Sequence, residues 1–378
     1  MKGLLITHKG MEDIAALEVE ELIGKNSKTE ETCLIFDIKV YEDLFKLCYK
    51  SQSAIGVYCL LRKFNYNNII DDFRKNLEKI ELNEWLNKST QFKVKCIKTQ
   101  DNLSTPEIEK KLGELIINNI KEKYGYKQKV NLDSPEIIIF VYLLQNKCYV
   151  GIDFAGFDLS KRSYKIVVHP SDMRGTIAYS LVRLSEYNKK DTMLDCFSGS
   201  GTISLEAALF ESKFPINFFN KEKLIFPKCD KFKNYNFNKL FKKLDKGMSD
   251  NKLNINNIDS SMKYINYAKK NSKIAGIGKK ISFSRTELEW LDTKFRKGEI
   301  DKIITKLPSL QKNEINEIYN EFFYQAEFIL NEKGKIVLIG NKELIEKHSS
   351  KYKFEVSDQR KVFSGKMKYD VFVLTRQK

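Results

Sequence analysis

The residues best suited to chemistry lie in one glycine-rich segment, which reads Asp-Cys-Phe-Ser-Gly-Ser-Gly-Thr from Asp195 to Thr202. Glycine allows positive φ and close approach of the backbone to a ligand, and a helix that starts there offers unpaired N–H groups. Such a turn suits a phosphate or the methionine and ribose parts of S-adenosylmethionine. The alternative interpretation is a turn that has a structural role and binds no ligand. It matches neither a Walker A loop nor the G-x-G-x-x-G pattern. The candidate cofactor ligands are Asp195, Phe197, Ser198, Gly199, Gly201 and Thr202.

Two more acidic residues follow predicted strands further along the chain. Asp259 and its neighbour Ser260 come after the strand Leu253–Ile258, where a doubly wound fold binds ribose hydroxyls. The alternative is that Asp259 caps the predicted helix Met262–Ile274. Glu287 lies beyond the third strand, where it could meet an adenine amine or remain a solvated surface residue.

The elements that must position these residues alternate between strands and helices after Tyr164, which predicts a parallel α/β sheet. A Phe- and Lys-rich stretch at about 210–250 interrupts the alternation and is too long for a simple loop. The predicted strands are Thr192–Cys196, Leu253–Ile258, Ile281–Ser284, Lys302–Thr305, Lys335–Gly340 and Tyr369–Leu374.

The N-terminal part predicts two small α+β units. The first alternates short strands with helices to about residue 61, as a split βαβ unit does. The second runs from about residue 92 to 153. Its helix is predicted to start with Thr105 as N-cap and Pro106 in the first turn.

Composition narrows the class of protein. The formal net charge of +16 favours a polyanionic partner, although a Lys-rich proteome would give the same balance. Seven cysteines without a CxxC pair argue against a zinc site and against a disulfide framework, and the three dispersed histidines suggest no metal site. No apolar run approaches membrane-spanning length and no secretory signal is evident, so the cytoplasm is the expected compartment.

Taken in order, these segments resemble the THUMP-domain guanine-N2 RNA methyltransferases, which comprise archaeal transfer-RNA enzymes and related bacterial large-subunit ribosomal RNA enzymes. The resemblance covers nearly the whole chain. Residues 194–208 are close to the family's D-P-x-C-G-S-G-T-x-x-I-E-A-A. The other matching segments are 10–22 (ferredoxin-like start), 92–153 (THUMP), 158–164 (L-x-K-R-G-Y-R, with Ser163 for Gly), 173–176 (L-R-E/P-T), 224–232 (F-x-F-E-K-W-x-x-F) and 258–276 (second motif, with Ser261 for Asp).

The resemblance implies an α/β fold, with a Rossmann-like class I methyltransferase domain preceded by α+β ferredoxin-like and THUMP domains. The implied divisions are 1–65 ferredoxin-like, 66–160 THUMP, 161–185 linker, and 186–378 methyltransferase with an insertion at about 210–250. It implies S-adenosylmethionine as cofactor and structured RNA, above all transfer RNA, as partner. The residues themselves predict no membrane and no metal, and the predicted strand order favours a monomer. The implied phosphate ligands, each of which could instead be a solvated side chain, are Lys161, Arg162, Lys93, Lys95 and Lys98.

The loop after the fourth strand departs from the family pattern. Exocyclic-amine methyltransferases carry D/N-P/L-P-Y/F there, whereas this chain has Lys306-Leu307-Pro308-Ser309. Lys306 replaces the residue that accepts the amine N–H bonds, and a lysine ammonium has only donors. Ser309 replaces the aromatic residue that would stack on a flipped base.

Three functions therefore stay open. The first is an active methyltransferase that forms N2-methylguanosine in the acceptor-stem region of transfer RNA. The second is a catalytically silent RNA-binding relative. The third is a ribosomal RNA methyltransferase.

Overall fold

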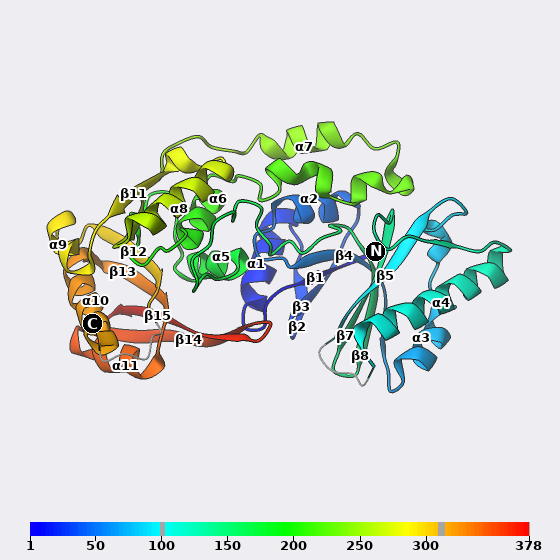
Figure 1. Ribbon diagram of the computed structural model, residues 1–378, viewed down its shortest axis with the longest axis horizontal. Helices are drawn as coiled ribbons and strands as arrows, with labels where there is room; N and C mark the ends of the chain where they lie inside the picture. Colours follow the sequence, from blue (N-terminus) through cyan, green and yellow to red (C-terminus); the bar gives the residue numbers. More distant parts are fainter. Residues whose placement is uncertain (99–102, 309–313, 378) are drawn as a thin grey trace. The chain divides into compact units, whose positions relative to one another are not determined.

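The computed structural model describes residues 1–98, 103–308 and 314–377, which form two compact units (Figure 1). The N-terminal unit comprises Met1–Ile6, Val19–Leu159 and Asn217–Leu244. The C-terminal unit comprises Thr7–Glu18, Ser160–Ile216 and Asp245–Lys378. The division falls inside the first helix, α1 (Glu12–Ile23). Among the described residues, no helix has both the length and the apolar character needed to cross a bilayer.

One eight-stranded sheet organises the N-terminal unit. Its strands are β1 (Lys2–Ile6), β2 (Ser27–Glu30), β3 (Cys33–Asp37), β4 (Gly56–Asn65), β5 (Gln91–Lys98), β6 (Lys129–Val130), β7 (Ile137–Leu144) and β8 (Lys147–Asp153). Their order in the sheet is β2-β3-β1-β4-β8-β7-β5-β6. The antiparallel pair β4–β8 joins the strands before residue 66 to those after residue 90, so the two predicted α+β units share one sheet.

The helices of this unit start and end at recognisable residues. They are α2 (Glu42–Lys50), α3 (Ile69–Leu77), α4 (Thr105–Tyr124) and α7 (Phe237–Asp245). The N-cap of α4 is Ser104, one residue before the predicted Thr105, because Ser104 and Glu107 form a reciprocal capping box. Helix α4 connects the parallel strands β5 and β7, as a βαβ crossover requires.

The Phe- and Lys-rich stretch packs against the N-terminal unit. Phe226 stacks on Phe45 with ring centroids 4.5 Å apart. The ammonium of Lys231 lies 4.3 Å from the ring centroid of Trp85. Buried phenylalanines, with lysine side chains lying over aromatic rings, therefore explain why Phe and Lys are interleaved in this stretch.

The C-terminal unit is built on a seven-stranded sheet. Its strands are β9 (Met193–Asp195), β10 (Ile255–Asp259), β11 (Ile281–Arg285), β12 (Ile300–Lys306), β13 (Leu330–Ile339), β14 (Phe354–Ser364) and β15 (Met367–Arg376). The order is β11-β10-β9-β12-β13-β15-β14, in which β15 is antiparallel to both of its neighbours and the other pairs are parallel. The sequence pattern did not predict β14, because this edge strand alternates charged residues with few apolar ones.

Helices cover both faces of this sheet (Figure 1). They are α5 (Gly175–Leu184), α6 (Thr202–Glu211) and α8 (Met262–Ile274) on one face, and α9 (Leu291–Lys294), α10 (Glu314–Ile329) and α11 (Lys342–Lys351) on the other. Met11 and Ile14, from the N-terminal segment, belong to the core on the first face. The strand order reverses between β9 and its neighbours β10 and β12, so a ligand crevice is expected at their carboxyl ends.

Candidate cofactor and catalytic site

The glycine-rich turn connects β9 to α6 at this reversal point. Gly199 and Gly201 have φ of +52° and +84°, which side chains rarely tolerate. A Cβ on Gly201 would lie 2.8 Å from the Cβ of Ala268 on α8, so close packing also requires glycine there. The Ser198 hydroxyl donates to Asn257 Oδ1 at 2.9 Å, which ties the turn to β10.

Asp259, the last residue of β10, lies directly beside this turn. Its Oδ2 accepts the Gly199 N–H at 2.9 Å, and its Oδ1 accepts the Ser261 N–H at 2.9 Å. The structure thus brings Asp259 together with the glycine turn and also with the start of α8. The two interpretations of Asp259 from the sequence are therefore compatible, since each carboxylate oxygen has a further lone pair.

Asp195 is fully buried at the end of β9. The Thr305 hydroxyl on β12 donates to its Oδ1 at 2.9 Å, while its Oδ2 has no hydrogen-bond partner among the described residues. Burial raises the pKa of Asp195 to about 8, with Thr305 opposing the shift and Asp259 adding to it. A buried carboxyl oxygen without a partner is costly, so this atom is suited to a polar ligand.

Asp172 is a central residue of the site that the sequence did not single out. It accepts hydrogen bonds from the Ser200 hydroxyl, from Thr202 Oγ1 at 3.4 Å and from the His169 N–H at 3.1 Å. The Lys165 ammonium lies 3.4 Å from its Oδ2. Asp172 thereby connects the glycine turn to the segment before α5. Its position, just before the 173–176 motif, is the only signal that the sequence offers.

Lys306 is the last residue of β12 and points toward that same segment. Its ammonium donates to the carbonyl oxygen of Ser171 at 2.6 Å and lies 5.4 Å from the ring centroid of Tyr369. Burial lowers the pKa of Lys306, Asp172 opposes the shift and Lys165 adds to it.

The rest of the predicted catalytic loop is held by the sheet and by α10. The N–H of Leu307 donates to the Ile339 carbonyl at 2.9 Å, and the Pro308 carbonyl accepts from the Tyr319 hydroxyl at 3.1 Å. Ser309 lies outside the described residues.

Glu287 lies just beyond β11 and is partly exposed. Its Oε1 is 3.3 Å from the Arg285 guanidinium, whose Nε donates to the Ser260 carbonyl at 2.9 Å. These contacts place Glu287 and Ser260 next to the carboxyl end of β10. The structure shows no direct contact between Glu287 and the glycine turn among the described residues.

The prediction that Arg162 binds RNA phosphate is wrong. Its side chain and that of Glu206 are both fully buried, with Nε and Oε1 2.7 Å apart. The Tyr164 hydroxyl donates to the same Glu206 oxygen at 2.7 Å. A buried ion pair cannot reach an RNA backbone, and a Cβ on Gly175 would lie only 2.5 Å from both partners.

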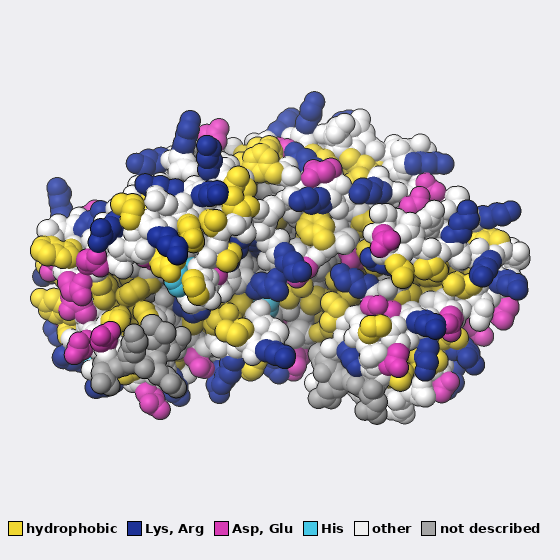
Figure 2. All heavy atoms as spheres, viewed as in Figure 1, with side chains coloured by type: hydrophobic (Ala, Val, Ile, Leu, Met, Phe, Trp, Pro, Cys, Tyr) yellow, Lys and Arg dark blue, Asp and Glu magenta, His cyan; other side chains and the backbone are white. Residues whose placement is uncertain are grey.

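The remaining predicted RNA ligands lie on the surface with local contacts. Lys93 donates to the Leu132 carbonyl at 3.1 Å, Lys98 donates to the Leu103 carbonyl, and the Lys95 ammonium is 3.9 Å from the buried carboxylate of Asp153. Lys161 is exposed. On the face shown in Figure 2, Lys and Arg side chains are spread among acidic ones and form no single patch.

Family models match most of the chain. The model described as "RMKL-like, methyltransferase domain" matches residues 162–370, more than half of the sequence, and the THUMP domain model matches residues 67–153. The chain is 30% identical over 380 residues to the tRNA (guanine(6)-N2)-methyltransferase of Methanocaldococcus jannaschii, with 97% of each chain covered.

Solved structures share the fold over the whole chain. A possible methylase from Clostridium difficile 630 gives a TM-score of 0.86 at 22% identity, covering 100% of this chain and 98% of that one. SMU.472, solved in complex with SAH, gives a TM-score of 0.83 at 18% identity with coverage of 100% and 98%. At these identities the likeness shows the fold alone.

Proposed function

The chain belongs to the family of RMKL-like methyltransferases and carries a THUMP domain, and on that premise we propose that it methylates the N2 amine of a guanosine in the acceptor-stem region of transfer RNA. S-adenosylmethionine is the proposed methyl donor. The similar Methanocaldococcus jannaschii protein is named for guanine 6 of transfer RNA. Membership in the family confirms the resemblance, and the order of THUMP and α/β methyltransferase domains, predicted from the sequence motifs.

The residues at the carboxyl end of the C-terminal sheet fit this cofactor. Asp195 Oδ2, which has no partner in the described part of the chain, suits an ammonium group. The Asp259 carboxylate, beside the glycine turn, suits ribose hydroxyls. The positive-φ glycines at 199 and 201 let the turn pack closely, since a Cβ would lie 3.2 Å from His169 and 2.8 Å from Ala268. When bound, S-adenosylmethionine supplies an electrophilic methyl group.

Lys306 must then accept the N–H bonds of the guanine amine, as an Asn or Asp does elsewhere in the family. A guanine amine is a weak nucleophile because its lone pair is delocalised, so an acceptor for its N–H bonds promotes attack. Protonated lysine has no lone pair, but neutral lysine has one. Since burial lowers the pKa of Lys306, we propose that the neutral amine accepts a guanine N–H while its own N–H donates to Ser171. Activity should therefore rise with pH.

One observation carries the proposal: a buried carboxyl oxygen of Asp195, which has no hydrogen-bond partner among the described residues, lies beside a glycine turn at the reversal point of the sheet. The test is incubation of the full chain with S-adenosylmethionine and a transfer RNA transcript, followed by mass spectrometry of the nucleosides. We expect N2-methylguanosine, and much less with Asp195→Ala. Transfer RNA that is bound but never methylated would instead favour the silent relative. Product with ribosomal RNA alone, in a parallel incubation, would favour the third function.

A further inference from the structure

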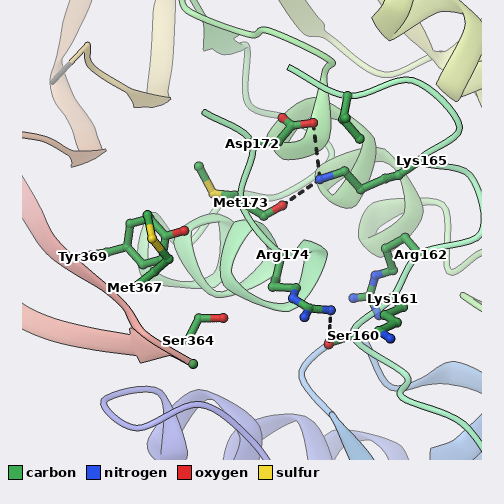
Figure 3. Close-up of a pocket in the computed structure, with 12 residues that line it drawn as sticks. Ser160, Lys161, Arg162, Lys165, Asp172, Met173, Arg174, Ser364, Met367 and Tyr369 are labelled. Carbon is green, nitrogen blue, oxygen red and sulfur yellow. Dashed lines mark hydrogen bonds and ion pairs between the residues drawn. The ribbon is translucent and has the colours of Figure 1, made fainter. Parts of the chain in front are cut away.

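A pocket of about 460 Å³ opens on the C-terminal unit and shares Asp172 with the candidate site (Figure 3). One wall comes from the segment before α5, and the other from the tip of the β14–β15 hairpin. The volume falls in the usual range for sites that hold a small organic ligand. The lining residues are Ser160, Lys161, Arg162, Lys165, Val168, Asp172, Met173, Arg174, Ser364, Gly365, Met367 and Tyr369.

The first wall is basic. It contributes four cationic side chains and the single carboxylate of Asp172. Arg162 is buried in its ion pair with Glu206, Lys165 pairs with Asp172, and Arg174 donates to Ser160 Oγ at 3.3 Å. Lys161 is exposed and makes no ion pair with any residue that the structure describes. This wall therefore suits an anion such as a phosphodiester.

The opposite wall is largely apolar. Met367 is 57% exposed at the hairpin tip, next to Gly365 with φ of +58°. Figure 3 shows Met367 and Tyr369 across the pocket from Arg174 and Lys161. An exposed methionine that faces a basic wall gives a base an apolar partner, since a thioether makes favourable contacts with aromatic rings.

The pocket adjoins the proposed catalytic loop. The Lys306 ammonium lies 5.4 Å from the ring centroid of Tyr369, which lines the pocket. Asp172 lines the pocket as well and accepts hydrogen bonds from Ser200 in the cofactor turn. A ligand here would therefore be next to the reacting nucleoside.

We propose that this pocket binds the nucleotide of the substrate RNA that adjoins the methylated guanosine, with its phosphate on the Lys161 wall and its base against Met367. The inference rests on the proposed function, because it requires RNA as the substrate. It adds an RNA contact close to the chemistry, separate from the THUMP domain.

The test measures the binding of a labelled transfer RNA transcript to the full chain by fluorescence polarisation across a series of salt concentrations, without cofactor. Lys161→Ala should weaken binding and reduce the slope of log K against log salt by about one unit, since one phosphate contact is lost. Met367→Ala should weaken binding about fivefold or more with an unchanged slope, because a packing contact releases no counterion.

Two matched controls belong to this test. Lys252→Ala removes an exposed lysine before the start of β10, at the amino ends of the parallel strands and so opposite the glycine turn. Val356→Ala trims a 38% exposed side chain near the far end of the same hairpin. Both should bind as the wild type does.

The outcomes separate this inference from the proposed function. Wild-type affinity and slope for both pocket variants, with a wild type that binds and methylates transfer RNA, would overturn the pocket alone. A wild type that binds no transfer RNA would overturn both. Binding without methylation would overturn the proposed activity, while the two slopes would still decide the pocket.

Discussion

Cofactor binding should be coupled to the ionisation of Asp195. This side chain is fully buried, one of its oxygens has no partner among the described residues, and its pKa is raised to about 8 by burial. Near neutral pH the carboxyl is therefore mostly protonated without cofactor. An ammonium group of S-adenosylmethionine would stabilise the carboxylate, so binding should release a proton.

The magnitude follows from the ionised fraction. With a pKa of about 8, roughly 1% of Asp195 is ionised at about pH 6 and roughly a quarter at about pH 7.5. Because the apparent dissociation constant is the intrinsic constant divided by the competent fraction, affinity should rise about twentyfold, or about 2 kcal/mol, over this range. Proton release near pH 7 should be close to one per cofactor.

Titration calorimetry in buffers of different ionisation enthalpy measures both quantities. Asp195→Asn is the control, because it keeps the shape but cannot ionise, and it also reveals any titration of the cofactor itself. It should bind about 1–3 kcal/mol more weakly at the upper pH, with little pH dependence. A flat wild-type profile, or the same slope in Asp195→Asn, would refute the reasoning.

The same residue predicts a pH effect on folding. Its folded-state pKa lies above the ordinary value of 3.8, so the folded state binds the proton more tightly than the unfolded state does. The stabilisation that this gives is fully present below about pH 4 and is lost as pH rises toward 8. Denaturant unfolding without cofactor should show this loss in the wild type and its absence in Asp195→Asn.

Three further predictions concern other parts of the molecule. Methyl transfer should increase by up to about tenfold per pH unit below the lowered pKa of Lys306, and Lys306→Asn should flatten this profile. If Lys306→Asn and Lys306→Ala both kept the wild-type rate and pH profile, Lys306 would not be the acceptor of the amine N–H. Glu206→Gln should destabilise the chain by about 3–5 kcal/mol in denaturant unfolding, because it leaves the Arg162 charge buried without its partner; a loss below about 1 kcal/mol would count against that burial. Gly113→Ala should stabilise α4 by about 0.5–1 kcal/mol, since a Cβ there would meet only Val94 at 3.9 Å, and a lowered midpoint would contradict this.

The sequence by itself determined the glycine turn and most of the strands of the C-terminal sheet. These features are local: glycine positions fix the turn, and apolar periodicity fixes each strand. The helix predicted at Met262–Ile274 has those bounds in the structure. Strand β14 was missed for the same reason, because its mixture of charges lacks the apolar alternation on which the prediction depends.

The assignment of segments to units was decided by the tertiary structure. Residues 7–18 bury Met11 and Ile14 in the core of the C-terminal unit. Residues 217–244 pack instead in the N-terminal unit, through rings such as Phe226. Neither assignment can be predicted from the position of the segment in the sequence. Hydrophobic burial is non-directional, so an apolar face can pack against any complementary apolar surface.

The same limit applies inside the site. From the sequence, Asp195 and Lys306 were correctly placed at strand ends. Arg162, however, was predicted to bind RNA phosphate, and Asp172 was not identified. The structure pairs Arg162 with Glu206, 44 residues away, and Asp195 with Thr305, 110 residues away. Whether a charged side chain meets solvent, a ligand or a buried partner depends on such distant contacts, and only the tertiary structure decided them, because periodicity and spacing describe neighbours along the chain alone.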